Sequence, residues 1–161
     1  MPPTRRRTVL GALATLLVAG CSSPGGGTET GEGGTVTGDL DLREANVVGV
    51  AYRTDGGEYE FDVTLHHDDE GEDGYADWWQ IERLDGTQLA RRDLAHPHAT
   101  QPFTRSTRVS VPEDVSCVVV RGHDRTHGYG GVAMVVNLDS GRITELRQGS
   151  EKASVSASDC P

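Results

Sequence analysis

The chain has 161 residues, which is enough for one domain of ordinary size but too few for two well-packed domains. Its 15 basic and 25 acidic residues give a formal net charge of −10, which argues against nucleic acid as a partner. Three cysteines are too few for a disulfide-dense scaffold or a four-thiolate zinc site. Composition therefore leaves a small acidic globular domain.

The N-terminal 20 residues have the pattern of an export signal. A basic cluster at Arg5–Arg7 precedes an apolar run from Val9 to Ala19, which is shorter than the roughly 20 residues that a membrane-spanning helix needs. The paired arginines indicate a twin-arginine export signal. Small residues lead directly into Cys21 and resemble a lipobox, so we predict a lipid on Cys21 that anchors the protein to the outer face of the cytoplasmic membrane. The alternative is an ordinary signal peptide followed by a chance cysteine.

The basic residues have an unusual composition, because only Lys152 is a lysine and all the others are arginines. An acidic chain with arginine in place of lysine resembles proteins of salt-loving archaea, in which high salt screens the self-repulsion of the acidic surface. Together with its signal, the chain resembles haloarchaeal twin-arginine-exported lipoproteins that carry a small secreted β-domain of unassigned function. The alternative is a merely acidic protein from a GC-rich genome.

The chain divides into three predicted parts: a signal peptide at 1–20, the lipidated Cys21 with a flexible tether at 21–45, and a single β-domain at 46–161. The tether is rich in Gly, Ser and Thr and has too few large apolar residues to fold alone. After it, short apolar runs alternate with turn residues. We expect strands at about 46–53, 58–67, 77–84, 87–94, 103–111, 116–123, 131–138 and 142–148.

The strand pattern is clearest between Glu58 and Leu65, where apolar and polar residues alternate strictly and predict one buried and one solvated face. About eight short strands with this spacing predict an all-β fold, either an antiparallel immunoglobulin-like sandwich or a small barrel. Trp78 and Trp79 are adjacent and must face opposite ways on a strand. We therefore expect one of them in the core and the other exposed or covered by a loop.

Two cysteines remain once Cys21 carries a lipid, which makes an even pair in an oxidising compartment. Cys117 starts an apolar strand, and Cys160 ends a polar tail. We predict a disulfide between Cys117 and Cys160 that attaches this tail to the sheet. The alternative is two free thiols, one buried and one exposed.

All six histidines occur in three pairs, His66-His67, His96-Pro97-His98 and His123 with His127. If the strands alternate in direction, all three pairs lie at one end of the domain. Neutral imidazoles with a nearby carboxylate suit Zn²⁺ or Cu²⁺. The ligands that we predict for such a site are His96, His98, His123, Asp124 and His127. The alternative is a network of hydrogen-bonded loops without a metal.

Other patterns of chemical interest carry less weight. The acidic segment 68–74 does not have the spacing of an EF-hand, so a solvated loop is favoured over a calcium site. Ser106, Asp124 and His127 have triad chemistry but no nucleophile elbow, so we do not expect an enzyme. The glycine-rich segment 128–131 is followed by no helix that could support a phosphate cradle.

Three functions follow from this pattern. The first is a membrane-anchored extracellular lipoprotein that binds a divalent transition metal at the histidine end. The second is an interaction module that presents the same loops, with an exposed tryptophan, to a surface protein or glycan. A small metal-dependent hydrolase is the third. Segments 96–106 and 123–131 resemble segments of small exported bacterial and archaeal proteins of unassigned function, which implies that the two loops act as one unit.

Overall fold

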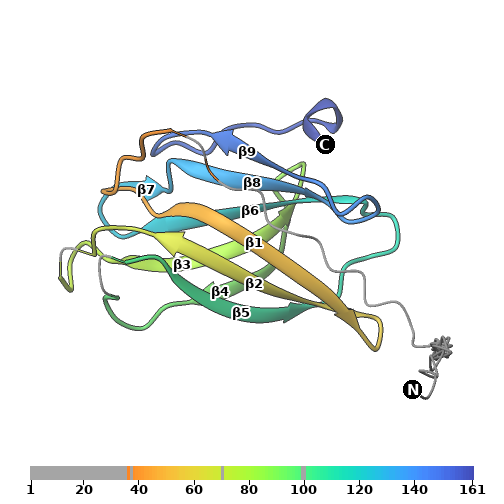
Figure 1. Ribbon diagram of the computed structural model, residues 1–161, viewed down its shortest axis with the longest axis horizontal. Helices are drawn as coiled ribbons and strands as arrows, with labels where there is room; N and C mark the ends of the chain where they lie inside the picture. The colour runs from red at the N-terminus through yellow and green to blue at the C-terminus, as the bar shows by residue number, and fades with distance from the viewer. Residues whose placement is uncertain (1–35, 37, 70, 99–100) are drawn as a thin grey trace, which may run out of the picture.

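The computed structural model describes residue 36 and residues 38–69, 71–98 and 101–161, so Cys21 and the predicted signal peptide lie outside the described residues. The strands form two antiparallel sheets that pack face to face as a sandwich (Figure 1). The predicted all-β sandwich is confirmed, and the barrel alternative is wrong because the sheets are separate. Within the described part of the chain, no helix is long and apolar enough to cross a membrane.

Sheet A has three strands and sheet B has six. The strand order of sheet A is β1-β2-β5, with β1 at Asn46–Asp55, β2 at Glu58–His66 and β5 at Phe103–Val109. The order of sheet B is β4-β3-β6-β8-β9, with β3 at Ala76–Arg83, β4 at Gln88–Asp93, β6 at Cys117–Asp124, β8 at Val132–Asn137 and β9 at Ile143–Arg147. The short β7 at Gly128–Tyr129 pairs with β6, and a 3-10 helix lies at Ala157–Asp159.

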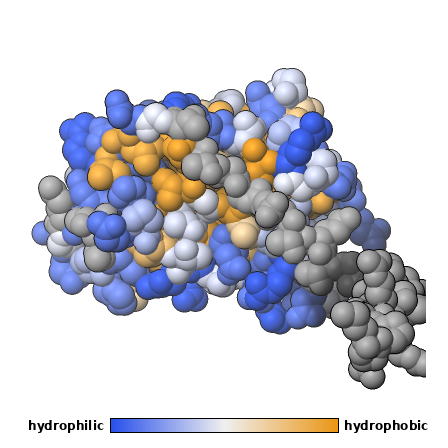
Figure 2. Space-filling model, viewed as in Figure 1, coloured by the Kyte–Doolittle hydropathy of each residue, from blue (hydrophilic) through white to orange (hydrophobic). Residues whose placement is uncertain are grey.

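The core lies between the sheets and follows the predicted alternation. In β2, Phe61, Val63 and Leu65 are fully buried among the side chains of the facing sheet. The outer face of sheet A is polar, and Glu60 on β2 pairs with both Arg53 and Arg108. Figure 2 shows hydrophilic residues along the lower part of this face. One side of sheet A therefore builds the core while the other meets solvent.

Strands β7 and β8 run in the same direction along β6, and Gly130-Gly131 interrupts them. The chain before β1 crosses at this interruption. A Cβ atom on Gly122 or Gly130 would overlap the carbonyl oxygen of Ala45, which is fully buried. The glycine-rich segment 128–131 thus allows two backbones to approach closely.

Gly130→Ala should lower the free energy of unfolding by about 2–3 kcal/mol, because the new methyl group must displace the Ala45 backbone. Thermal unfolding followed by circular dichroism at constant salt measures this change. Gly49→Ala is the matched control, since its Cβ would make only an ordinary contact of 3.4 Å with Thr64. An equal effect of both substitutions would contradict the packing role of Gly130.

The segment before β1 belongs to the packed structure. Val36 packs against the core, and the guanidinium of Arg147 donates a hydrogen bond to the Asp39 carbonyl oxygen at 3.2 Å. The sequence assigns these residues to the tether. The first strand begins at the domain boundary predicted at residue 46, but packing against the sandwich begins before it.

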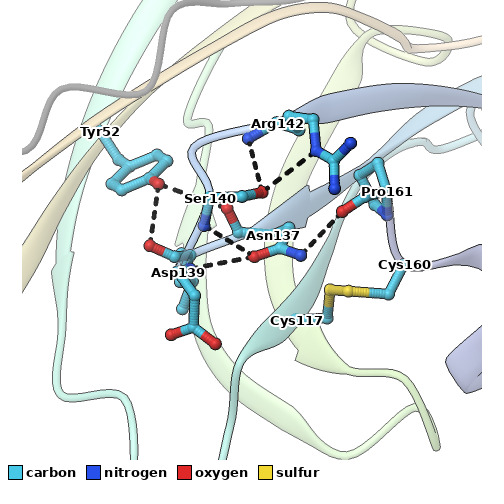
Figure 3. The surroundings of a disulfide bond; sticks show 9 residues. Tyr52, Cys117, Asn137, Asp139, Ser140, Arg142, Cys160 and Pro161 are labelled. Carbon is cyan, nitrogen blue, oxygen red and sulfur yellow. Dashed lines mark hydrogen bonds between the residues drawn. A yellow bond between two sulfur atoms is a disulfide. The ribbon is translucent and has the colours of Figure 1, made fainter.

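A C-terminal strap, residues 148–161, lies against the outer face of sheet B. The predicted disulfide between Cys117 and Cys160 is present, with a Cα–Cα distance of 6.1 Å (Figure 3). Beside it, the Asn137 side chain donates to the Pro161 carbonyl oxygen at 2.7 Å. The same side chain accepts hydrogen bonds from the backbone of Asp139 and Ser140, so it joins the turn after β8 to the end of the chain.

Beneath the strap lies a buried ion pair that the sequence does not predict. Arg121 on β6 is 1% exposed and donates from Nε to Glu82 on β3, which is 0% exposed. Arg121 also donates to the Ala153 carbonyl oxygen at 2.8 Å, and Lys152 Nζ lies 2.7 Å from Glu82 Oε2. These contacts hold the strap on the sheet with buried charges.

Candidate functional site

The three histidine pairs lie at the same end of the sandwich, as the alternation of strand directions predicts. Strands β2, β4 and β6 all end there, on the left in Figure 1. We call this region the histidine end; it comprises segments 66–76, 94–98 and 123–131, with 41–45 beside them. Each histidine pair makes contacts of its own.

Asp69 organises the first part of the histidine end. This fully buried carboxylate accepts a hydrogen bond from the Ala76 backbone at 3.0 Å and another from the His98 backbone. Its backbone is left-handed, with φ 43°, a conformation that Asp tolerates better than most residues. Asp69 therefore ties the loop after β2 to the loop after β4.

His67, at 1% exposure, is fully engaged beside Asp69. Its Nε2 lies 3.0 Å from the Arg43 carbonyl oxygen, which can only accept, so Nε2 is the donor. Its Nδ1 lies 2.7 Å from Asp69 Oδ1. Both ring nitrogens have partners in the protein, which leaves neither for a metal.

His98 packs flat on Phe103, with ring centroids 3.9 Å apart and planes within 8°. The ring of His96 lies 4.9 Å from that of His98. The Nδ1 of His98 is buried and has no hydrogen-bond partner among the described residues. Burial lowers the pKa of His98, and the positive charge of Arg105 lowers it further, so the neutral ring is favoured.

His123 belongs to a row of side chains on the outer face of sheet B. Its ring stacks on Trp78 at 4.2 Å, and the guanidinium of Arg91 lies 4.4 Å from the centre of the same tryptophan. The Nδ1 of His123 lies 2.7 Å from Asp77 Oδ1. Trp78 is covered by these neighbours and is only 8% exposed. The prediction of one core tryptophan is confirmed by Trp79. Trp78 faces the other way, as expected, but it is covered, so the exposed tryptophan predicted for an interaction module is wrong.

Asp124 and His127 shape the turn between β6 and β7. Asp124 is fully buried, and its Oδ1 accepts the backbone N–H groups of Thr126 at 2.7 Å and His127 at 2.6 Å. The His127 ring is 39% exposed, with Nδ1 3.4 Å from the same oxygen. This turn joins β6 and β7 as a hairpin. Asp124 Oδ2 is buried and lacks a hydrogen-bond partner among the described residues.

A cavity of about 350 Å³ at the histidine end is lined partly by residues that the sequence assigns to the tether. Its lining includes Asp41, Glu44 and His127. Burial raises the pKa of Glu44, and the charges of Asp41 and Asp124 raise it further. The alternation of apolar and charged residues at 40–43 is the one sequence signal that could have indicated this packed segment.

The structure does not bring the predicted metal ligands together. Among the residues that it describes, no group of three or more His, Cys, Asp or Glu side chains could hold a metal ion. The reason lies in the side-chain directions. His123 stands on the outer face of sheet B, Asp124 follows it on the opposite face, and His98 packs on Phe103 at the edge of sheet A.

The chain is 58% identical over 138 residues to a protein of Halomicrobium mukohataei named "Putative lipoprotein". The match covers 85% of this chain and 69% of the relative. No protein-family model matches the chain, and no solved structure matches it. The relative comes from a haloarchaeon, in agreement with the halophilic type predicted from composition. The chain therefore belongs to the same family as this haloarchaeal lipoprotein.

Proposed function

We propose that this protein is a cell-surface lipoprotein whose β-sandwich is an interaction module for an extracellular protein or glycan. The paired arginines and short apolar run of residues 1–20 support twin-arginine export. The small residues before Cys21 and the haloarchaeal relative support a lipid on that cysteine. The lipid holds the domain at the outer face of the cytoplasmic membrane.

The binding role rests on one observation: the polar side chains of the histidine end contact other parts of the protein and hold its loops in place. His67, Asp69 and Asp124 hold loops onto the sheets, and His123 is stacked in a row of side chains. A surface fixed in this way loses little conformational entropy when it binds a partner. These contacts favour recognition over a reaction centre.

The position of Ser106, the serine of the triad chemistry considered above, does not support a hydrolase. Ser106 lies on β5 in sheet A, where its hydroxyl donates to Asp62 at 2.5 Å. Asp124 and His127 lie at the end of β6 in sheet B. The three residues therefore do not form a triad.

Cys21→Ser should release the protein from the membrane into the medium, because the polar sequence that follows Cys21 has no membrane affinity of its own. Membrane fractionation at high salt measures the release. A Cys117→Ser, Cys160→Ser variant is the matched control and should stay with the membrane. If the Cys21→Ser protein still sediments with membranes, the lipid anchor on Cys21 is refuted.

The interaction role is tested with the immobilised mature protein and material released from haloarchaeal cell envelopes at high salt. We expect saturable binding of one envelope protein or polysaccharide. The same protein after reduction and unfolding serves as the control. Binding that never saturates, or that the unfolded chain reproduces, would contradict an interaction module.

A second candidate is the predicted Zn²⁺ or Cu²⁺ site, now favoured only by the adjacent rings of His96 and His98. If it exists, calorimetric titration at neutral pH should show stoichiometric binding that weakens in acid, as the imidazoles become protonated. Because burial lowers the pKa of His98, protonation of this ring begins to compete below its ordinary value of about 6.5. His98→Ala should abolish the heat. His127→Ala should leave it unchanged, because the His127 ring lies beside Asp124 instead. No heat above background would exclude the site.

A further inference from the structure

One long side of the sandwich has two strand edges without partners. Strand β4 ends sheet B and pairs only with β3, while β5 ends sheet A and pairs only with β2, among the described residues. The two strands lie near each other at the bottom of Figure 1. We call this side the β4–β5 seam. Such edges present backbone N–H and C=O groups that can pair with an added strand.

Two arginines emerge at the β4–β5 seam. Arg92 on β4 lies opposite Trp79, and Arg105 on β5 lies opposite Val63. Trp79 and Val63 are fully buried in the core, so both arginines stand on the inner faces of their sheets. Because they occupy the last strands, their side chains reach solvent at the open side: Arg92 is exposed and Arg105 is partly exposed.

Arg92 and Arg105 differ from most arginines of this chain, which has 25 acidic residues, in their lack of a carboxylate partner among the described residues. Most arginines of the described part form an ion pair with a carboxylate, as Arg91 does with Asp93 at 2.7 Å. Neither Arg92 nor Arg105 has such a partner among the described residues. Among the described residues, Arg105 donates to the Thr104 carbonyl oxygen and lies 5.5 Å from the Phe103 ring. Two guanidinium groups at one seam thus remain available for an external anion.

Two other arginines, Arg125 and Arg142, also lack a carboxylate partner among the described residues. They lie on separate turns, Arg125 after β6 and Arg142 just before β9. Strand β9 is also an edge strand, but among the described residues only one such arginine lies beside it. The β4–β5 seam is therefore distinguished by two arginines without a carboxylate partner along unpaired strand edges.

We propose that the β4–β5 seam binds an extended acidic peptide segment, which adds as a strand along β5 while its carboxylates pair with Arg92 and Arg105. Strand addition supplies backbone hydrogen bonds, and the guanidinium groups select for acidic side chains. The partly buried Phe103, two residues before Arg105 on β5, offers apolar contact beside it. This inference rests on the proposed interaction role and adds to the histidine end a second binding surface with a partner chemistry of its own.

The test measures fluorescence anisotropy of a labelled peptide with alternating Asp and Val residues, titrated with the mature protein at high and at moderate salt. We expect saturable binding and protection of the β5 amides from hydrogen exchange. Arg92→Gln and Arg105→Gln should each weaken binding by about tenfold, since each removes a charge-assisted hydrogen-bonding group. Arg142→Gln is the matched control and should bind as the wild type does.

Four outcomes would overturn the proposal. Equal binding of the same peptide with Asn in place of Asp would remove the role of charge. Binding of a polyuronate but not of the peptide would identify a glycan site instead. Self-association of the Arg92→Gln and Arg105→Gln variants, with no peptide binding by the wild type, would show that the arginines only protect a strand edge. If an envelope partner binds these variants normally, the seam assignment fails while the interaction module stands.

Discussion

Arg121→Met should lower the free energy of unfolding by about 3–5 kcal/mol, the range for removing one partner of a buried ion pair. The substitution removes one of the two cationic partners of the Glu82 carboxylate, which is 0% exposed, and leaves Lys152 as the other. It also removes the hydrogen bond that Arg121 donates to the Ala153 carbonyl oxygen. Thermal or chemical unfolding at constant salt measures the loss.

Two further variants give this prediction its controls. Arg121→Met combined with Glu82→Leu should recover most of the stability, because apolar side chains of similar volume replace both charges. Arg83→Met removes a more exposed ion pair with Asp114 and should cost far less stability than Arg121→Met, because solvent screens this pair. If Arg121→Met costs no more than Arg83→Met, the buried pair does not stabilise the sandwich.

Cys117→Ala combined with Cys160→Ala should lower the free energy of unfolding by about 4 kcal/mol. The two cysteines are 43 residues apart, and closing a loop of that length restricts the unfolded chain by about this amount. The measurement is chemical unfolding of the oxidised, reduced and double-alanine proteins. Mass spectrometry of the unreduced protein should find both cysteines in one linked pair of peptides.

Removing the disulfide should lower the stability of the whole domain and should not release the strap, because the strap keeps other contacts. Lys152 and Asn137 still hold the segment through Glu82 and the Pro161 carbonyl oxygen. The double-alanine protein should therefore fold with the strap in place and unfold earlier. Two alkylatable thiols in the exported wild-type protein would refute the bond.

The strands could be predicted because their alternation is local. The segment Glu58–Leu65 places apolar residues on one face of the strand, and this face is buried between the two sheets. The two-residue β7 was not predicted. It is separated from β8 by Gly130-Gly131, where the backbone of Ala45 approaches closely. That contact joins residues far apart in the sequence, so no local pattern reports it.

The candidate site was predictable in its place but not in its geometry. Strand alternation puts all three histidine pairs at one end. Whether the histidine rings come together depends on the face of the sheet that each side chain occupies. It also depends on which neighbours form hydrogen bonds with the ring nitrogens. Trp78 and Asp77 engage His123, and Asp69 engages His67. The sequence carries no signal for these pairings.

The buried charges of Arg121 and Glu82 escaped prediction for a different reason. A charged residue in an alternating strand normally marks the solvent face, and these two do lie on the outer face of sheet B. The strap covers that face, which the polar composition of residues 148–161 does not suggest. Only the pairing of Cys117 with Cys160 indicated that the tail returns to the sheet.

The crossing of Ala45 at Gly122 and Gly130 determines how the domain bears a mechanical load. A protein held by its N-terminal side is pulled through the segment that precedes β1. After the contacts of Val36, Asp39 and Arg43, the pull reaches Ala45 before it reaches β1, because this residue lies ahead of β1 and its carbonyl lies against both glycines. Steric interlock therefore resists extension before any hydrogen bond between β1 and β2 is strained. The ladder of sheet A can begin to peel only after the backbone at Ala45 has been drawn past the two glycines.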